Sequence, residues 1–203
     1  MNRRGPFVAF EGVDASGKST QARRAASKRA ALFAFEPGDS PLGVELRGWL
    51  LNAATPMDPE TEALLMLADR SHHARRVIEP TLASGRAVIT DRYYPSSLAY
   101  QGYGRGVDLG LLRVATQLAI GDCRPDLIVL LDVSLETANE RRVRDHEDRF
   151  ESADAAFHER VRAGYLELAQ SDTTPWVVID ANVHRDEVSA RVDEALDALT
   201  WPA

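Results

Sequence analysis

The stretch Phe7-Val8-Ala9-Phe10-Glu11-Gly12-Val13-Asp14-Ala15-Ser16-Gly17-Lys18-Ser19-Thr20 decides the fold of this 203-residue chain. A short β-prone run, 7–10, leads into residues 12–19, which fit the pattern GxxxxGK[ST]. Glycines leave backbone N–H groups free to surround phosphate oxygens, and the helix that follows adds its positive N-terminal end. The pattern predicts a nucleotide site in which Lys18 reaches the terminal phosphates and the Ser19 hydroxyl binds Mg²⁺. The alternative, a plain glycine turn before a surface lysine, is disfavoured by the strand before it and the helix after it.

Composition and charge bound the class of protein. The chain has 24 basic and 31 acidic residues, a net charge of −7 and a hydrophobic fraction of 44%. This length suits one domain, and the acidic balance argues against a nucleic-acid binder. Cys123 is the single cysteine, which favours a reducing compartment and a passive role for its thiol. The lack of a signal-peptide pattern and of a long apolar run predicts a cytoplasmic protein without membrane contact.

Apolar runs alternate with helical patterns along the chain. We expect strands at 7–10, 31–35, 87–91, 126–132 and 176–180. We expect helices at 19–30, 40–51, 58–82, 109–120, 135–144, 153–168 and 187–199, and a glycine-rich functional loop at 92–106. This alternation is typical of an α/β fold with a parallel sheet, in which ligands bind at the carboxyl ends of the strands. The phosphate loop, 36–37, 91–92 and the segment after Asp132 follow four of these strands, so they should meet in one crevice.

Two charged residues stand where the third predicted strand ends. Asp91 is a carboxylate suited to hold Mg²⁺ through water or to organise the attacking group. The planar guanidinium of Arg92 suits a second phosphate. A structural Asp–Arg pair that caps the strand remains the alternative.

Residues 141–151, RRVRDHEDRFE, form a dense charge cluster. Most such runs are solvated helix surface. Phosphoryl transfer, however, needs positive charge over the moving group, and an arginine in that role contributes about 10³–10⁵ in rate. The phosphate loop supplies only Lys18, so we expect 141–151 to form an arginine-rich lid that also excludes water.

Five stretches in this order and spacing, FEGVDASGKSTQ, EPGDSPLG, DRYYPSSLAYQGYGRG, RPDLIVLLDV and DRFE, resemble the thymidylate kinase family over nearly the whole chain. The resemblance implies a P-loop nucleoside-monophosphate-kinase-like three-layer fold with a five-stranded parallel sheet, in a single domain 1–203 with a small lid. It implies phosphorylation of dTMP to dTDP by ATP through direct in-line transfer, with Mg²⁺ as cofactor. It also implies a homodimer.

The resemblance assigns roles to individual residues. The ATP phosphates would bind Gly12, Val13, Asp14, Ala15, Ser16, Gly17, Lys18, Ser19 and Thr20. The metal would be held by Ser19, Asp91 and Glu36, and catalysis would rest on Lys18, Asp91, Arg92, Arg141 and Arg149. One branch of the family has an arginine in the phosphate loop where Ala15 stands here. The resemblance therefore implies that the lid supplies it, with Arg141 and Arg149 as the best matches.

Nine residues would contact dTMP by the same resemblance. They are Asp14 and Tyr100 near the sugar, Glu36, Arg47 and Arg92 around the phosphate, and Met66, Arg70, Ser97 and Gln101 at the base. An amide and a hydroxyl match the donor and acceptor pattern of a uracil-type base, whereas cytosine would leave buried groups unpaired.

Three departures from the family pattern bear on affinity and selectivity. Phe35 stands where arginine usually precedes Glu-Pro-Gly, Met66 replaces an aromatic ring at the base, and the segment between Lys18 and Glu36 is several residues short. A nucleotide kinase of altered base specificity is therefore one alternative. A nucleotide-binding regulator without catalysis is another.

Overall fold

Five parallel strands form one sheet in the computed structural model, which describes residues 4–52, 54–141, 149–150 and 153–201. The strand order is β2-β3-β1-β4-β5, and every pairing is parallel. The bounds are β1 Phe7–Glu11, β2 Leu32–Phe35, β3 Val88–Asp91, β4 Leu127–Asp132 and β5 Trp176–Asp180. The expected parallel α/β fold is thereby confirmed, and β1 carries the phosphate loop at the centre of the sheet.

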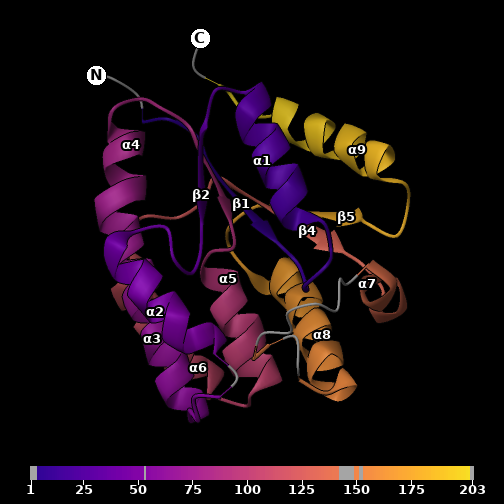
Figure 1. Cartoon of the computed structure of the whole chain (residues 1–203). Helices are drawn as coiled ribbons and strands as arrows, with labels where there is room; N and C mark the ends of the chain where they lie inside the picture. The colour runs from indigo at the N-terminus through magenta and orange to yellow at the C-terminus, as the bar shows by residue number, and fades with distance from the viewer. Residues whose placement is uncertain (1–3, 53, 142–148, 151–152, 202–203) are drawn as a thin grey trace.

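Helices cover both faces of the sheet (Figure 1). On one face α1 packs beside α9, and the other helical segments lie against the opposite face or beyond the strand ends. Their bounds are α1 Lys18–Lys28, α2 Pro41–Leu51, α3 Pro59–His73, α4 Glu79–Ala83, α5 Tyr94–Ser97, α6 Leu109–Ile120, α7 Leu135–Arg141, α8 Ala155–Ser171 and α9 Arg185–Asp197. No helix in these described ranges is long and apolar enough to cross a membrane.

Two π-helical segments correct the sequence-based expectations. The helix expected at 58–82 contains a π-helical stretch, η1 (Ala74–Ile78), between α3 and α4. The loop expected at 92–106 is instead α5 followed by η2 (Leu98–Gly104), and most of it is buried. Gly104 shows why: a Cβ there would lie 2.5 Å from the ring of Phe157. Gly104 thus serves close packing of η2 against α8, which a glycine-rich composition does not distinguish from a loop.

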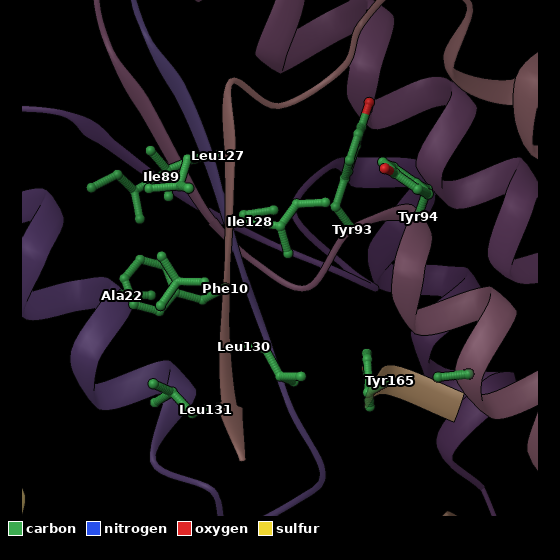
Figure 2. Packing of buried hydrophobic residues seen from close by; sticks show 14 of the residues in the cluster. Phe10, Ala22, Ile89, Tyr93, Tyr94, Leu127, Ile128, Leu130, Leu131 and Tyr165 are labelled. Atoms are coloured by element: carbon green, nitrogen blue, oxygen red, sulfur yellow. The ribbon is translucent and has the colours of Figure 1, made fainter. Parts of the chain in front are cut away.

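Buried side chains from β1 and β4 pack on both faces of the sheet (Figure 2). Phe10 and Leu131 lie on the side of α1, whereas Ile128 lies on the other side with Tyr93 and Tyr165. All five are almost completely buried. This two-sided burial explains the nearly continuous apolar sequence of the strands and holds the phosphate loop on a rigid base.

Candidate active site

A cavity of about 510 Å³ opens at the carboxyl ends of β1, β2 and β3. All nine residues expected to contact dTMP line it, together with Lys18, Ser19 and Asp91. Its cationic side chains outnumber its acidic ones, although the protein as a whole is acidic: they are Lys18, Arg23, Arg47, Arg70 and Arg92. The cavity therefore suits an anionic ligand.

The phosphate loop enters α1 through residues in left-handed backbone conformations. Gly12, Ala15 and Gly17 have φ values of 147°, 60° and 88°. A Cβ at Gly12 would lie 2.7 Å from the Leu131 carbonyl oxygen, so only glycine fits there. The Ser16 hydroxyl is buried and has no hydrogen-bond partner among the described residues. A buried, unpaired hydroxyl beside a helix N-terminus is suited to receive an anion.

Lys18, Asp14 and Arg92 meet at the mouth of this loop. Lys18 Nζ lies 3.4 Å from Asp14 Oδ1, and the Arg92 guanidinium donates to the same oxygen. Burial opposes ionisation of Asp14, but Arg92 and Lys18 outweigh it and hold the pKa of the carboxyl well below its usual range. Burial and the nearby Arg92 charge lower the pKa of Lys18. Asp14 thus remains a carboxylate that orders both cations.

Buried hydroxyl groups and the carboxylate of Glu11 hold the Arg92 side chain in place. Arg92 has a φ of 71° and donates to Tyr100 Oη at 3.0 Å and to Ser96 Oγ at 3.1 Å. Glu11 accepts from Ser96 Oγ at 2.7 Å and from Tyr165 Oη at 2.9 Å. Burial raises the pKa of Glu11 to about 6. Sequence reasoning missed Glu11, although a charged residue at the end of a central strand was a usable signal.

Arg70 also lines the cavity and is 2% exposed. Its Nε donates to Glu36 Oε2 at 2.7 Å, and its NH1 donates to Ser97 Oγ at 2.5 Å. The other Glu36 oxygen lies 2.9 Å from Nδ1 of His73. Burial would lower the pKa of His73, but Asp39 and Glu36 raise it to about 9. The polar pattern of α3 did not reveal His73 as part of this group.

This arrangement bears on the residues expected to hold a metal. Both Glu36 oxygens bond to Arg70 and His73, which argues against the expected role of Glu36 as a metal ligand. Asp91 Oδ1 is buried without a partner among the described residues, and Ser19 lines the same cavity. One hydroxyl and one free carboxylate oxygen are donors that Mg²⁺ accepts when water completes its shell. Ser19 and Asp91 therefore fit the metal.

The departures from the family pattern also fall in the cavity. Phe35 and Met66 both line it, and the Phe35 ring stacks on Phe33 at 6.2 Å. Arg47 donates to the Pro37 carbonyl at 2.6 Å, while Arg23 lies over the Phe33 ring. Arg47 and Arg23 therefore remain as cations close to the position where Phe35 lacks one.

The two arginines expected to be catalytic lie apart from the cavity lining. Arg141 NH1 donates to the Ala181 carbonyl at 2.8 Å, and Arg149 NH1 lies 3.9 Å from Glu62 Oε2. Of the expected lid, 142–148 and 151 fall outside the described residues. The lid and its catalytic arginines stay a prediction.

Comparisons with known proteins agree with this geometry. The family model described as Thymidylate kinase matches residues 10–192. The chain is 43% identical to the thymidylate kinase of Burkholderia vietnamiensis, over 97% of this chain and 99% of that protein. It is 45% identical to the thymidylate kinase of Thermomicrobium roseum, over 94% and 95%. The crystal structure of thymidylate kinase from Ehrlichia chaffeensis superposes with a TM-score of 0.78 at 30% identity, covering 94% of this chain and 98% of that one.

Proposed function

The chain belongs to the thymidylate kinase family and phosphorylates dTMP with ATP, and we propose how its residues divide that work. The observation that carries the proposal is the single cavity that joins the phosphate loop to all nine residues expected at dTMP. The two alternatives, altered base specificity and a catalytically silent regulator, are not favoured, since near-full-length relatives are thymidylate kinases.

The donor phosphates of ATP bind to residues 12–20 in this proposal. Backbone N–H groups and the Ser16 hydroxyl surround the phosphate oxygens, and Lys18 reaches the transferred phosphoryl group. Transfer is direct and in line, with no covalent enzyme intermediate. Mg²⁺, held by Ser19 and Asp91, neutralises charge on the phosphates when it is bound.

The acceptor phosphate of dTMP binds beside Arg92 and Arg47. Arg92 presents a planar guanidinium fixed by Asp14 and Tyr100, so little side-chain freedom is lost when phosphate binds. Asp14 and Tyr100 lie beside the sugar of dTMP, and the bulky ring of Tyr100 disfavours a 2′-hydroxyl there. These residues align the acceptor oxygen with the phosphate loop.

The base binds at the end of the cavity formed by α3 and η2. Arg70 is a donor-only group, which suits a carbonyl oxygen of thymine, and Gln101 and Ser97 complete the polar edge. Met66 covers the ring of the base with a flexible thioether. Because dUMP lacks only a methyl group, its rejection should be worth about 1–3 kcal/mol.

Positive charge over the transferred group comes from the predicted lid, 141–151. Arg141 and Arg149 flank the undescribed part of that segment, and both lie beside groups that accept hydrogen bonds. We assign catalysis to these two arginines because the loop position Ala15 supplies none.

A homodimer is part of the proposal, and α6 offers its surface. Leu111, Val114 and Leu118 follow helical spacing on α6 and are 71%, 72% and 79% exposed. Leu64 on the neighbouring α3 is also exposed. Light scattering should give the mass of two chains, and Leu118→Asp should reduce it to one; an unchanged mass would contradict this interface. The cytoplasmic location stays a prediction.

A substrate panel tests the assignment of the cavity. Purified protein with ATP and Mg²⁺ should phosphorylate dTMP in preference to dUMP, dCMP and dGMP. Lys18→Ala should lower kcat by about 10²–10³, whereas Lys28→Ala, at the exposed end of the same helix, should not. Preference for another acceptor, or full activity in Lys18→Ala, would refute the proposed roles.

A further inference from the structure

Glu62 is a buried carboxylate next to the proposed base site. It lies in the first turns of α3 and is 2% exposed. The side-chain amide nitrogen of Gln101, which is itself 1% exposed, donates to Glu62 Oε1 at 2.9 Å. Gln101 lines the cavity and Glu62 does not, so Glu62 stands directly behind a residue that faces the ligand.

The hydrogen bond to Glu62 selects one of the two possible orientations of the Gln101 amide. The two ends of a glutamine amide have almost the same shape, but one end donates and the other accepts. An ionised carboxylate only accepts, so the amide nitrogen must face Glu62. The reverse orientation would bring two acceptor oxygens together in a buried site. Glu62 thus fixes which of its groups Gln101 presents to the cavity.

Two arginines hold Glu62 in place. Arg105 NH2 lies 3.4 Å and Arg149 NH1 lies 3.9 Å from Glu62 Oε2. A buried charge needs such partners, because leaving it unpaired is strongly unfavourable. Oε2 faces both arginines, and Oε1 accepts from the Gln101 amide at 2.9 Å and from Arg105 Nε at the longer distance of 3.5 Å.

We propose that Glu62 is a positioning residue that sets the base selectivity of this enzyme by fixing the orientation of the Gln101 amide. The inference rests on the proposed placement of the base at Gln101. With its nitrogen on Glu62, the Gln101 amide turns its carbonyl oxygen to the cavity. This oxygen can accept from the N3–H of thymine, whereas the unprotonated N3 of cytosine is itself an acceptor and needs a donor. A fixed amide matches one pattern, whereas an amide free to turn matches both. Arg70 still donates only, so selectivity falls without vanishing when Glu62 is replaced.

The test compares kcat/KM for dTMP and for dCMP in Glu62→Gln. Glutamine keeps the shape, but it accepts from or donates to Gln101 equally well, so both orientations become available. The dTMP-to-dCMP ratio should fall about 10-fold to 100-fold. Glu60→Gln is the matched control, because it removes the same charge from an exposed position on α3 and should leave the ratio unchanged.

Two further variants separate orientation from folding. Arg105→Gln keeps the contact between Glu62 and Gln101 and should keep the ratio. The double variant Glu62→Gln with Arg105→Gln removes the unmatched charge as well, and should lose selectivity as Glu62→Gln does. If the folded double variant keeps the ratio, or if both substrates lose kcat/KM equally, the inference is overturned. If Gln101→Ala also leaves the dTMP-to-dCMP ratio unchanged, the proposed placement of the base at Gln101 is wrong as well as the inference about Glu62.

Discussion

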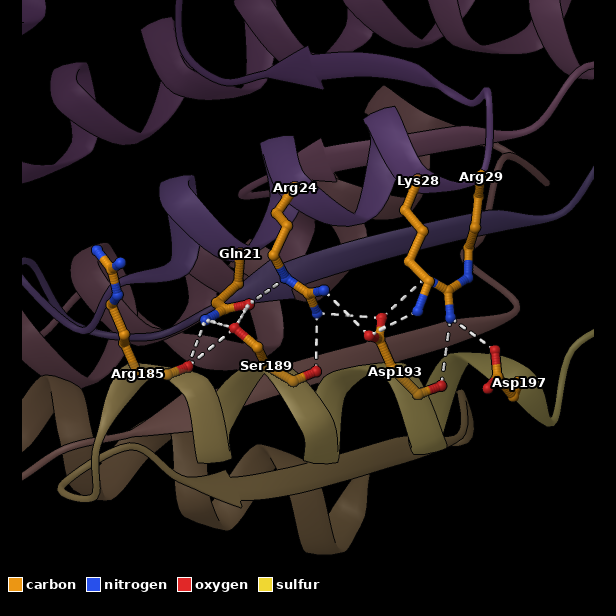
Figure 3. A network of polar contacts seen from close by, with 8 residues as sticks. All are labelled: Gln21, Arg24, Lys28, Arg29, Arg185, Ser189, Asp193 and Asp197. Atoms are coloured by element: carbon orange, nitrogen blue, oxygen red, sulfur yellow. Dashed lines mark hydrogen bonds and ion pairs between the residues drawn. The ribbon is translucent and has the colours of Figure 1, made fainter.

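Two ion-pair clusters of this molecule use the same chemistry in different settings. In the cavity, Arg92 and Asp14 pair with side-chain exposures of 16% and 19%. Between α1 and α9, Asp193 accepts hydrogen bonds from Arg24, Lys28 and Arg29 (Figure 3). There Lys28 is 55% exposed, so solvent screens a large part of the attraction.

The two clusters differ in whether their cationic groups remain available to a ligand. Arg92 spreads its donors over a carboxylate, hydroxyls and a carbonyl around the cavity, and its guanidinium lines the space where a phosphate is proposed to bind. Arg24 and Lys28 of α1, with Arg29 directly after it, converge on carboxylates and carbonyls of α9. These contacts hold the C-terminal helix to the phosphate-loop helix. Breaking the first cluster should therefore cost activity and stability, and breaking the second should cost stability alone.

The largest effect is expected from Arg92→Ala. It removes the proposed phosphate ligand and leaves Asp14 buried with one cation fewer. We expect kcat/KM to fall by about 10³ or more and the free energy of unfolding to fall by about 3–5 kcal/mol. Steady-state kinetics and urea unfolding measure the two effects. Arg92→Lys keeps the charge and should recover stability more than activity. Full activity in Arg92→Ala would remove Arg92 from the mechanism, and full activity in Arg92→Lys would contradict the need for a planar guanidinium.

Glu11→Gln should give an intermediate, pH-dependent effect. Because burial raises the pKa of Glu11 to about 6, the folded state holds its proton more tightly than the unfolded state does. Its contribution to stability is therefore present in full below the ordinary glutamate pKa of 4.5. It is lost as the pH rises through 6, a change of about 2 kcal/mol. Thermal unfolding between pH 4.5 and 7.5 should show this slope in the parent protein and a smaller one in Glu11→Gln. Equal slopes would contradict the assignment.

Asp193→Asn tests the cluster between α1 and α9. Burial opposes ionisation of Asp193, but hydrogen bonds from Arg24, Lys28 and Arg29 hold its pKa well below the usual range. Its stabilisation is thus present above the unfolded pKa of about 3.9 and is lost as the pH falls below that value. We expect Asp193→Asn to cost about 1 kcal/mol at pH 7, with kcat/KM unchanged. A loss of activity at full stability would mean that this cluster also serves catalysis.

The residues of the candidate site differ in whether the sequence alone could reveal them. Lys18, Asp91 and Arg92 were predictable because local motifs place them in the phosphate loop or at the end of a strand, and parallel strands bring those segments together. Glu11 and Glu62 were missed because a buried carboxylate is recognised only through partners far away in the chain, here Tyr165 and Gln101 respectively.

Residues 98–104 were expected to be a loop for a related reason. Gly102 and Gly104 signal flexibility in isolation, but their small size serves contact with neighbouring helices. A Cβ at Gly102 would lie 2.4 Å from the Leu109 side chain, and one at Gly104 would meet Phe157. That meaning depends on the position of α6 and α8, which no local pattern contains.

The smallest effect should come from Glu187 and Arg191 on α9, which form a pair at i and i+4 and 2.6 Å. Their side chains are 52% and 41% exposed, and neither joins the Asp193 cluster. Because the acidic residue comes first, the helix dipole favours the pair, yet its contribution should be only about 0.2–0.5 kcal/mol. A double-mutant cycle with Glu187→Ala and Arg191→Ala measures it through urea unfolding. The coupling should vanish in 1 M salt; a coupling that survives there would mean that solvent screens α9 less than its exposure implies.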